Sequence, residues 1–267
     1  MTAPLPVLLS VPHGGLMIPR EVLDDFRLDL DAVLYDGDTY ARELYSLEER
    51  VEHYMDTEIA RAVLDLNRAA SDRPPQNPDG VTKTVDVSGK QIWREKDGLS
   101  PETVDRLIIN YYQPYHKTLA MVAASGKAVV GIDCHTMLAE SPGSDETQRE
   151  VRPMICISNR GDGEGEPVDE PVTAPANLLR ALRDALLNQF QHEDMSAEPV
   201  SLNRPFKGGY ITKHHGKEGP LPWIQIEFNR ALYIAPHAIL AVKPDMRTEK
   251  RLADLREKFY RAIKNVV

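Results

Sequence analysis

The chain has 267 residues, of which 42% are hydrophobic and 27% are charged. This composition is typical of a globular protein and excludes a disordered, fibrous or low-complexity chain. The formal net charge is −9, and because an acidic surface repels phosphate backbones, nucleic acid is not an expected partner. We expect residues 1–267 to form a single domain, since single α/β domains reach this length.

We expect neither a membrane span nor a secretion signal in this sequence. No basic region followed by a long apolar stretch begins the chain, and no run of about 18 apolar residues occurs in it. We therefore expect no membrane partner and a cytoplasmic location. Cys134 and Cys156 both lie in apolar runs, which favours two buried thiols over one disulfide. No pattern in the sequence predicts an oligomeric state.

Short apolar runs alternate along the chain with longer stretches of helical periodicity. In chain order, we predict a strand over 6–12, a helix over 38–51, a strand over 59–67, a helix over 101–125, strands over 127–134 and 154–158, a helix over 174–190, a strand over 223–229 and a helix over 248–267. Strands that are separated by crossover helices favour a mostly parallel or mixed sheet with helices on both faces.

Residues that typically begin, interrupt or end helices refine this pattern. Ser100 is a typical N-cap for the helix over 101–125, Pro114 should interrupt that helix, and Gly126 should end it. The stretches 69–98 and 162–175 are rich in Pro, Asp and Gly, and we predict that both are long surface loops.

Several catalytic signatures are missing. The sequence has no Gly-x-Ser-x-Gly, no Walker A motif, no Gly-x-Gly-x-x-Gly and no His-Glu-x-x-His. These absences argue against a serine hydrolase with a nucleophile elbow, a P-loop enzyme, a dinucleotide-binding enzyme and a helix-borne metalloprotease.

Polar residues instead gather where predicted strands end or helices begin. In an open α/β sheet, ligands bind beyond the carboxyl ends of the strands. The residues placed there are His13, Asp36, Asp38, Asn67, Arg68, His135 and Glu227. Two imidazoles and one carboxylate are the ligands of a catalytic zinc site with one open position, and a further carboxylate can take a proton from water.

Each of these residues also has a purely structural interpretation. A single His after a strand is more often structural than a ligand, and Asp36 or Asp38 alone is typical of a helix N-cap. Glu227 lies inside an apolar strand, where an ion pair with Arg61 or Arg230 would account for it. Considered alone, these residues leave both interpretations open.

Seven stretches of the sequence resemble the N-formylglutamate amidohydrolase (deformylase) family, in the order in which that family has them. They are LLSVPHGGLMIP, DGDTYARELY, RAVLDLNR, YYQPYHKTL, GIDCHTM, NRPFKGGYITKHHG and IQIEFNRALY. The last two are the most specific. That family is similar in turn to zinc carboxypeptidases and aspartoacylases. The resemblance implies an α/β fold, a three-layer α/β/α sandwich around a mixed, mostly parallel sheet of the zinc-exopeptidase and phosphorylase/hydrolase kind.

The resemblance also implies a site for one Zn²⁺ ion. His13 and His135 match the imidazole ligands of such a site. Zinc carboxypeptidases place a Glu ligand three residues after the first His, but that position is Leu16 here. We therefore expect Asp36 to supply the carboxylate, with Asp38 as the close alternative.

Catalytic and substrate-binding roles follow from the same resemblance. Glu227 matches the general base that later returns the proton, and Arg61 matches a position from which a guanidinium can reach the carbonyl oxygen or a second carboxylate. Asn67 and Arg68 match the pair with which aspartoacylase-like enzymes hold a substrate carboxylate. The expected substrate-binding residues are Asn67, Arg68, Gly208, Gly209 and Arg230. A turn in a hairpin would explain the two glycines equally well.

The implied reaction is hydrolysis of N-formyl-L-glutamate to formate and glutamate, a step of histidine catabolism. Two segments depart from the family pattern, since 36–39 reads DGDT where the family has Asp-Thr-Asp-Trp, and 85–89 reads VDVSG near a family Thr-Phe-Asp-Gly. We expect these changes to affect the preferred substrate rather than the chemistry. The alternatives are a related zinc amidohydrolase for another small carboxylate-bearing N-acyl amino acid, and a non-catalytic anion-binding protein.

Overall fold

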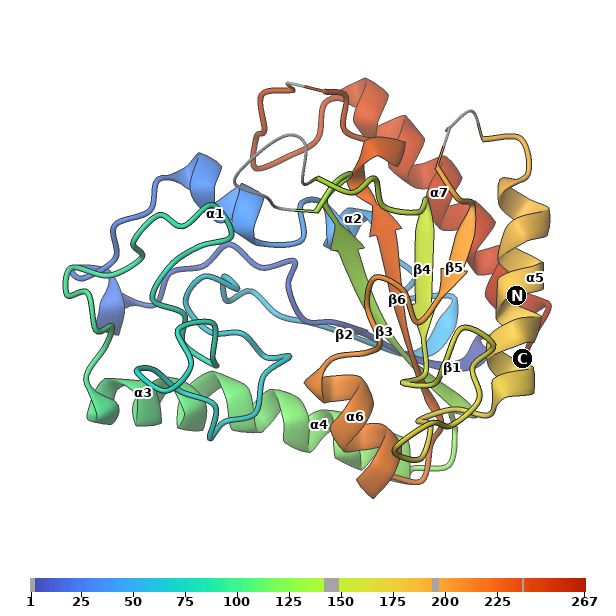
Figure 1. Cartoon of the computed structure of the whole chain (residues 1–267), viewed down its shortest axis with the longest axis horizontal. Coiled ribbons are helices and arrows are strands. Elements are labelled where there is room, and N and C mark those ends of the chain that lie inside the picture. The colour runs from blue at the N-terminus through green and yellow to red at the C-terminus, as the bar shows by residue number, and fades with distance from the viewer. Residues whose placement is uncertain (1–2, 142–148, 194–196, 237) are drawn as a thin grey trace.

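One mixed sheet of six strands organises the computed structural model, which describes residues 3–141, 149–193, 197–236 and 238–267. The strands are β1 (Leu5–Val11), β2 (Val51–Asp56), β3 (Val130–Met137), β4 (Ile155–Ser158), β5 (Val200–Leu202) and β6 (Trp223–Asn229). They lie in the order β2-β1-β3-β6-β4-β5 (Figure 1). Strands β2, β1, β3 and β6 are parallel, whereas β4 runs antiparallel to β6 and carries β5 parallel to itself. The predicted α/β fold with a mixed, mostly parallel sheet is confirmed.

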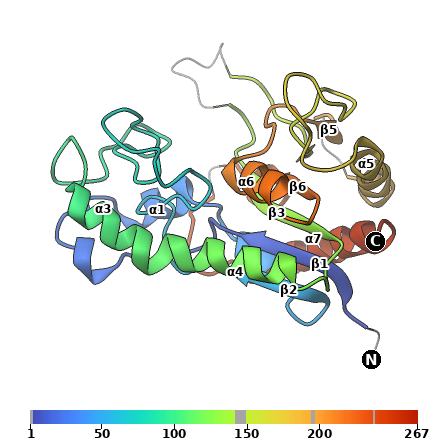
Figure 2. The ribbon, with the colours of Figure 1, turned by 90° about the horizontal axis from the view of Figure 1, so that it is seen from below.

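Helices cover both faces of this sheet. They are α1 (Leu30–Asp36), α2 (Ala41–Leu44), α3 (Pro101–Leu107), α4 (Gln113–Ala124), α5 (Ala176–Phe190), α6 (Tyr210–Glu218) and α7 (Met246–Lys264), with short 3-10 turns over Arg20–Val22 and Arg230–Leu232. Helices α2, α5 and α7 pack into one hydrophobic core, and α3, α4 and α6 pack with the irregular segment 59–93 into a second core on the opposite face (Figure 2).

Alternation of side chains along β1 explains the two cores. Val7, Leu9 and Val11 enter the core under α5 and α7, whereas Leu8 enters the core under α4. A strand with both faces covered in this way reads as a continuous apolar run, which is why the sequence showed LPVLLSV without polar alternation.

The helix predicted over 101–125 is present, with its cap, its interruption and its end at the expected residues. The Oγ of Ser100 accepts a hydrogen bond from the backbone N–H of Thr103 at 3.3 Å. A π-helical turn over Ile108–Tyr112 joins α3 to α4 just before Pro114, which has no N–H to continue the regular helical pattern. Gly126 has a φ of +74° and follows the last turn.

Two predicted elements were wrong. Of the helix over 38–51, only the single turn α2 forms, because Tyr40 has a φ of +60° and the chain turns again before β2 begins at Val51. The run 59–67 is not a strand. It forms turns, and the strand that pairs with β1 on this side is β2, which was not predicted.

The reason for the second error is physical. Val63, Leu64 and Leu66 are fully buried in the core under α4, so the run carries several buried apolar residues although it pairs with no named strand. A buried apolar run of this length gives no periodicity that separates a strand from irregular chain.

The structure also bears on the two cysteines and on membrane-spanning segments. Cys134 and Cys156 are both buried free thiols, as predicted. Among the described residues, no helix combines the length and the apolar character needed to cross a bilayer.

Gly131 in β3 provides a test of the packing between β3 and β6. A Cβ at this position would lie 2.5 Å from two atoms of the Trp223 indole, and this indole is completely buried. We expect Gly131→Ala to lower the free energy of unfolding by about 1–3 kcal/mol, as measured by urea denaturation. Gly163→Ala is the matched control, because a Cβ added there would meet no other side chain or backbone atom within 4 Å among the described residues. Equal unfolding midpoints for the two variants would contradict this packing.

Candidate metal centre

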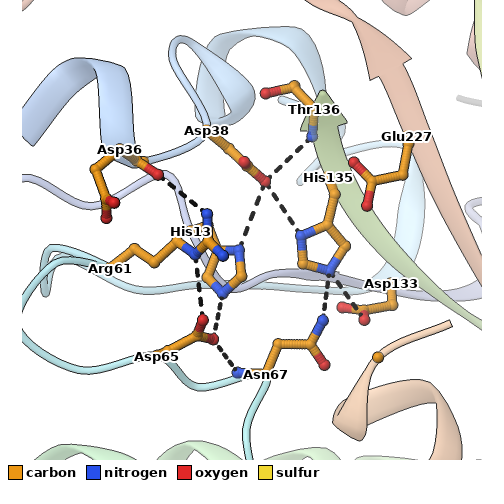
Figure 3. Close-up of polar contacts among 12 residues, drawn as sticks. His13, Asp36, Asp38, Arg61, Asp65, Asn67, Asp133, His135, Thr136 and Glu227 are labelled. Atoms are coloured by element: carbon orange, nitrogen blue, oxygen red, sulfur yellow. Dashed lines mark hydrogen bonds and ion pairs between the residues drawn. The ribbon is translucent and has the colours of Figure 1, made fainter. Parts of the chain in front are cut away.

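Two imidazoles and one carboxylate converge beyond the carboxyl end of β1 and beside β3. His13 follows β1, His135 lies in β3 and Asp38 lies in the turn after α1. The Oδ2 of Asp38 is 3.1 Å from Nδ1 of His135 and 3.8 Å from Nδ1 of His13 (Figure 3). All three residues are buried, and one possible ligand atom from each lies within 4.8 Å of the others. A tetrahedral zinc ion separates its ligand atoms by roughly 3.3 Å, so this donor set fits such an ion.

Buried carboxylates hold the far nitrogens of both imidazoles. Nε2 of His13 lies 2.8 Å from Oδ1 of Asp65, and Nε2 of His135 lies 3.0 Å from Oδ2 of Asp133. Ligand histidines in metal sites typically have their second nitrogen held in this way, which fixes the ring and leaves Nδ1 for the ion. Neither carboxylate was predicted from the sequence. Their signal was an Asp two residues before Asn67 and another two residues before His135.

Asp38 is fixed by contacts that do not involve the imidazoles. Its Oδ2 accepts the backbone N–H of Thr136 at 3.1 Å, and its Oδ1 lies 3.3 Å from Nη2 of Arg230. Arg230 is itself buried and donates to the Oγ1 of Thr136 and to the carbonyl of Tyr35. Substrate binding by Arg230 stays a prediction, and the structure shows in addition that its guanidinium contacts the carboxylate of Asp38.

Asp36, which we had favoured as the carboxylate ligand, has other partners. Its Oδ1 forms a buried ion pair with Lys83 and accepts the backbone N–H of Val87 at 2.9 Å. The structure therefore places Asp38, and not Asp36, beside the two imidazoles. Oδ2 of Asp36 is buried and has no hydrogen-bond partner among the described residues.

Glu227 reaches the same site from β6. In the sheet register, Glu227 pairs directly with His135, so both side chains lie on the same face of neighbouring strands. Gln225 donates to Oε1 of Glu227 at 2.9 Å. Burial raises the pKa of Glu227 to about 7, with a further increase from Asp38 and a decrease from the nearby His135. A carboxyl with this pKa can both accept and return a proton near neutrality.

Arg61 and Asn67 lie at the same edge with most of their polar atoms engaged. Arg61 donates from Nε to Asp65 at 3.2 Å and from Nη1 to the carbonyl of Asp36 at 3.1 Å. Asn67 accepts the backbone N–H of Ile211 at 2.7 Å, and its amide nitrogen is 3.2 Å from Nε2 of His135. Through these two contacts, Asn67 holds the first turn of α6 beside His135.

A cavity of about 440 Å³ opens onto these residues. Arg68, Gly208 and Gly209 line it, as the sequence led us to expect for substrate contacts. Arg68 pairs with Asp79 at 2.6 Å, however, so its charge already has a partner. Gly208 has a φ of +102°, and a Cβ on Gly209 would lie 2.2 Å from the amide of Asn67, so both positions favour glycine.

The charges of the site favour a cation. Burial opposes protonation of His135, but Asp133 and Asp38 outweigh it and raise its pKa well above the ordinary value. Burial lowers the pKa of His13, and the opposing effect of Asp65 does not cancel this. Three carboxylates, those of Asp38, Asp65 and Asp133, thus lie around two imidazoles in a buried space. Arginines pair with two of them, and the negative charge and imidazole nitrogens that remain suit a divalent ion between the Nδ1 atoms.

A second pair of histidines supports the segment that carries Asn67. His116 of α4 donates from Nε2 to the carbonyl of Leu66 at 2.9 Å, and its Nδ1 is 3.0 Å from Nε2 of His215 in α6. Burial lowers the pKa of His116 to about 4 and that of His215 to about 3. Both imidazoles are therefore neutral in the folded protein and serve a structural role.

Comparison with protein families gives a match over most of the chain. The model of a family described as N-formylglutamate amidohydrolase matches residues 5–234. A relative from Pseudomonas aeruginosa called N-formylglutamate deformylase is 26% identical over 92% of this chain and 89% of its own length. A relative of the same name from Pseudomonas putida is 26% identical over 86% of this chain and 82% of its own length.

Solved structures share the fold at lower identity. The crystal structure of N-formylglutamate amidohydrolase from Ralstonia eutropha JMP134 superposes with a TM-score of 0.73 and 19% identity, covering 99% of this chain and 95% of that one. A gene product from Agrobacterium tumefaciens superposes with a TM-score of 0.64 and 18% identity, covering 98% and 90% of the two chains. These likenesses support the α/β fold.

The two neutral histidines predict how stability depends on pH. An unfolded imidazole binds a proton below about pH 6.5, whereas His116 and His215 resist protonation until much lower pH. Protons therefore bind preferentially to the unfolded chain, and stability falls as pH decreases from about 6.5. We expect each imidazole to account for about 1–2 kcal/mol of the loss in unfolding free energy between pH 7 and pH 5.

Urea denaturation of His215→Gln at the two pH values tests this expectation. The loss of stability on acidification should be smaller in this variant than in the wild-type protein. His192→Gln, which changes an exposed histidine, is the control and should keep the wild-type loss. The same loss in all three proteins would show that the buried pair does not contribute.

Proposed function

The chain belongs to the N-formylglutamate amidohydrolase family and is a hydrolase of amide C–N bonds, and on this basis we propose that it cleaves N-formyl-L-glutamate to formate and glutamate. The observation that carries the proposal is the convergence of His13, Asp38 and His135 next to Glu227. We further propose that the enzyme depends on one zinc ion, is cytoplasmic and acts in histidine catabolism. The proposed site residues come from distant parts of the chain and meet at one cavity.

Nδ1 of His13, Oδ2 of Asp38 and Nδ1 of His135 would hold the zinc ion. When bound, zinc supplies a Lewis acid that lowers the pKa of water and polarises the amide carbonyl. The protein's own contribution to this site is rigidity. Each proposed ligand is held by a second side chain: His13 by Asp65, His135 by Asp133 and Asp38 by Arg230.

Glu227 carries the proton in the proposed reaction. Its carboxylate accepts a proton from the attacking water while a bond forms between the water oxygen and the formyl carbon. It then donates that proton to the amide nitrogen as the C–N bond breaks, so that formate and a free amine are released. Gln225 holds Oε1 of Glu227 in place during both transfers.

Arg61 is proposed to assist at the carbonyl oxygen. Its Nε and Nη1 are engaged with Asp65 and the carbonyl of Asp36, so the guanidinium is held rigidly at the wall of the cavity. Among the described residues, none accepts a hydrogen bond from its Nη2. A fixed donor of this kind stabilises the negative charge that develops on the oxygen as water attacks.

A different N-acyl amino acid is the second candidate substrate. Val87 lines the cavity and its segment, 85–89, is one of the two that depart from the family pattern. Because Val87 also donates its N–H to Asp36 of the other departing segment, the two segments meet at one wall of the cavity. This contact favours an altered pocket for the substrate side chain or the acyl group.

Separate substitutions of Asp38 and Asp36 test the assignment of the metal carboxylate. We expect Asp38→Asn to lose bound zinc, because a neutral amide is a much poorer ligand for the ion. Asp36→Asn should keep zinc but lower the thermal stability, since it leaves buried Lys83 without its counter-charge. Elemental analysis after dialysis and thermal melting measure the two effects. Zinc loss in Asp36→Asn with retention in Asp38→Asn would reverse the assignment.

Glu227→Gln tests the proposed proton carrier. The variant should retain zinc, because Glu227 is not among the proposed ligands, and its kcat/KM for N-formylglutamate should fall by about 10²–10⁴-fold. Formate release measures the rate, and elemental analysis measures the metal. The exposed Glu218→Gln serves as the matched control with wild-type turnover expected. Turnover close to wild type in Glu227→Gln would exclude this role.

The same assay separates the two candidate substrates. N-formylglutamate should be hydrolysed faster than N-acetylglutamate and N-formiminoglutamate if the first proposal holds. The reverse order would favour the related amidohydrolase. A purified protein with neither zinc nor hydrolysis of any of the three compounds would favour the non-catalytic anion-binding protein.

A further inference from the structure

Arginine side chains supply most of the positive charge of the cavity. Among the described residues, the arginines that line it are Arg61, Arg68, Arg152 and Arg230. Three of these have a carboxylate partner: Arg61 pairs with Asp65, Arg68 with Asp79 and Arg230 with Asp38. Their charges are therefore already balanced within the protein.

Arg152 differs from the other three. Its guanidinium makes no hydrogen bond or ion pair with the described residues, although its Nε is buried. Burial lowers the pKa of Arg152, and neighbouring Arg230 lowers it further, against an opposing effect of Glu227. The guanidinium lies 5.0 Å from the centre of the Phe206 ring, which also lines the cavity.

The backbone holds Arg152 in this position. Its N–H donates to the carbonyl of Ala139 at 2.9 Å, and its carbonyl accepts from the amide of Asn229 at 3.3 Å. Ala139 follows β3 and Asn229 ends β6, so the residue is tied to the two strands that carry His135 and Glu227. These contacts fix the backbone of Arg152, and its side chain lines the same cavity as Glu227.

A half-buried guanidinium without an acceptor costs free energy unless a ligand supplies the missing partner. A carboxylate matches its planar donors and forms charge-assisted, often bidentate, hydrogen bonds. Lys207 at the same cavity is exposed, so water screens its charge and competes for its donors. Arg61 has one free donor, Nη2, but its charge is paired with Asp65, so among the described arginines of the cavity the guanidinium with neither an ion pair nor a hydrogen bond is that of Arg152.

We propose that Arg152 binds a carboxylate of the substrate and determines the preference of the enzyme for acidic N-acyl amino acids. This inference rests on the proposed function, because it places the substrate in the cavity beside Glu227. It reassigns to Arg152 the part that the sequence suggested for Arg68, whose charge is balanced by Asp79. Arg152 is a specificity-determining residue, and it takes no part in the proton transfers.

Three compounds test this assignment: N-formylglutamate, N-formylglutamine and the α-amide of N-formylglutamate. The second lacks the side-chain carboxylate and the third lacks the α-carboxylate. For Arg152→Met, we expect kcat/KM for N-formylglutamate to fall by about 10- to 100-fold, mainly through KM. The compound that lacks the contacted carboxylate should change by less than about threefold, which identifies the carboxylate that Arg152 binds.

Two further variants separate this role from a structural one. Arg152→Lys keeps the charge without the planar donors. It should therefore restore part of the preference for compounds that carry the contacted carboxylate. Arg149→Met removes an exposed arginine of the same segment that faces Glu140, and it should behave as the wild-type protein. The proposal would be overturned if Arg152→Met lost the same fraction of kcat/KM on all three compounds. It would also be overturned if Arg152→Met still preferred N-formylglutamate over both amide compounds as strongly as the wild-type protein does.

Calorimetric binding keeps this test independent of turnover. If the wild-type protein hydrolyses none of the compounds, the proposed function fails, and the affinities of the three compounds for wild type and Arg152→Met then decide the role of Arg152. Weaker binding only of those compounds that carry one particular carboxylate supports the inference. Unchanged affinities, or no binding to the wild-type protein, would overturn it.

Discussion

The contact of one buried carboxylate with two imidazoles is the interaction on which the site depends. Asp38 reaches His13 and His135, which follow or lie in neighbouring parallel strands, and Arg230 and Thr136 hold it there. A buried carboxylate is costly unless each oxygen is satisfied. Contacts with Arg230, with the backbone N–H of Thr136 and with the two imidazoles offset this cost. The same contacts bring three possible ligand atoms close to one another.

The sequence allowed much of this arrangement to be predicted. Parallel strands bring their carboxyl ends to one edge, so a polar residue after β1 and others in β3 and β6 were expected to meet, and the structure brings His13, His135 and Glu227 together. The choice between Asp36 and Asp38 could not be made from the sequence. Both precede the same apolar pattern, and it is Lys83, far along the chain, that engages Asp36.

Other errors have a similar origin in long-range contacts. The residues of 59–67 are buried by α4 from a distance in sequence, so their apolar character said nothing about strand pairing. The assignment of Arg68 to a substrate carboxylate stays a prediction, and its pairing with Asp79 was not visible in the sequence, just as Arg152 had no local motif to mark it. What distinguishes such arginines is whether a partner is present, and this depends on the folded chain.

The ion pair between Lys83 and Asp36 has a thermodynamic consequence. It joins the segment that includes Val87 at the cavity wall to the same turn that carries Asp38 two residues later. A molecule that stabilises this wall and an ion that stabilises the turn would then act on one shared element. By linkage, each would increase the affinity of the protein for the other by the same factor, so the affinity for that molecule and the retention of the metal would change together.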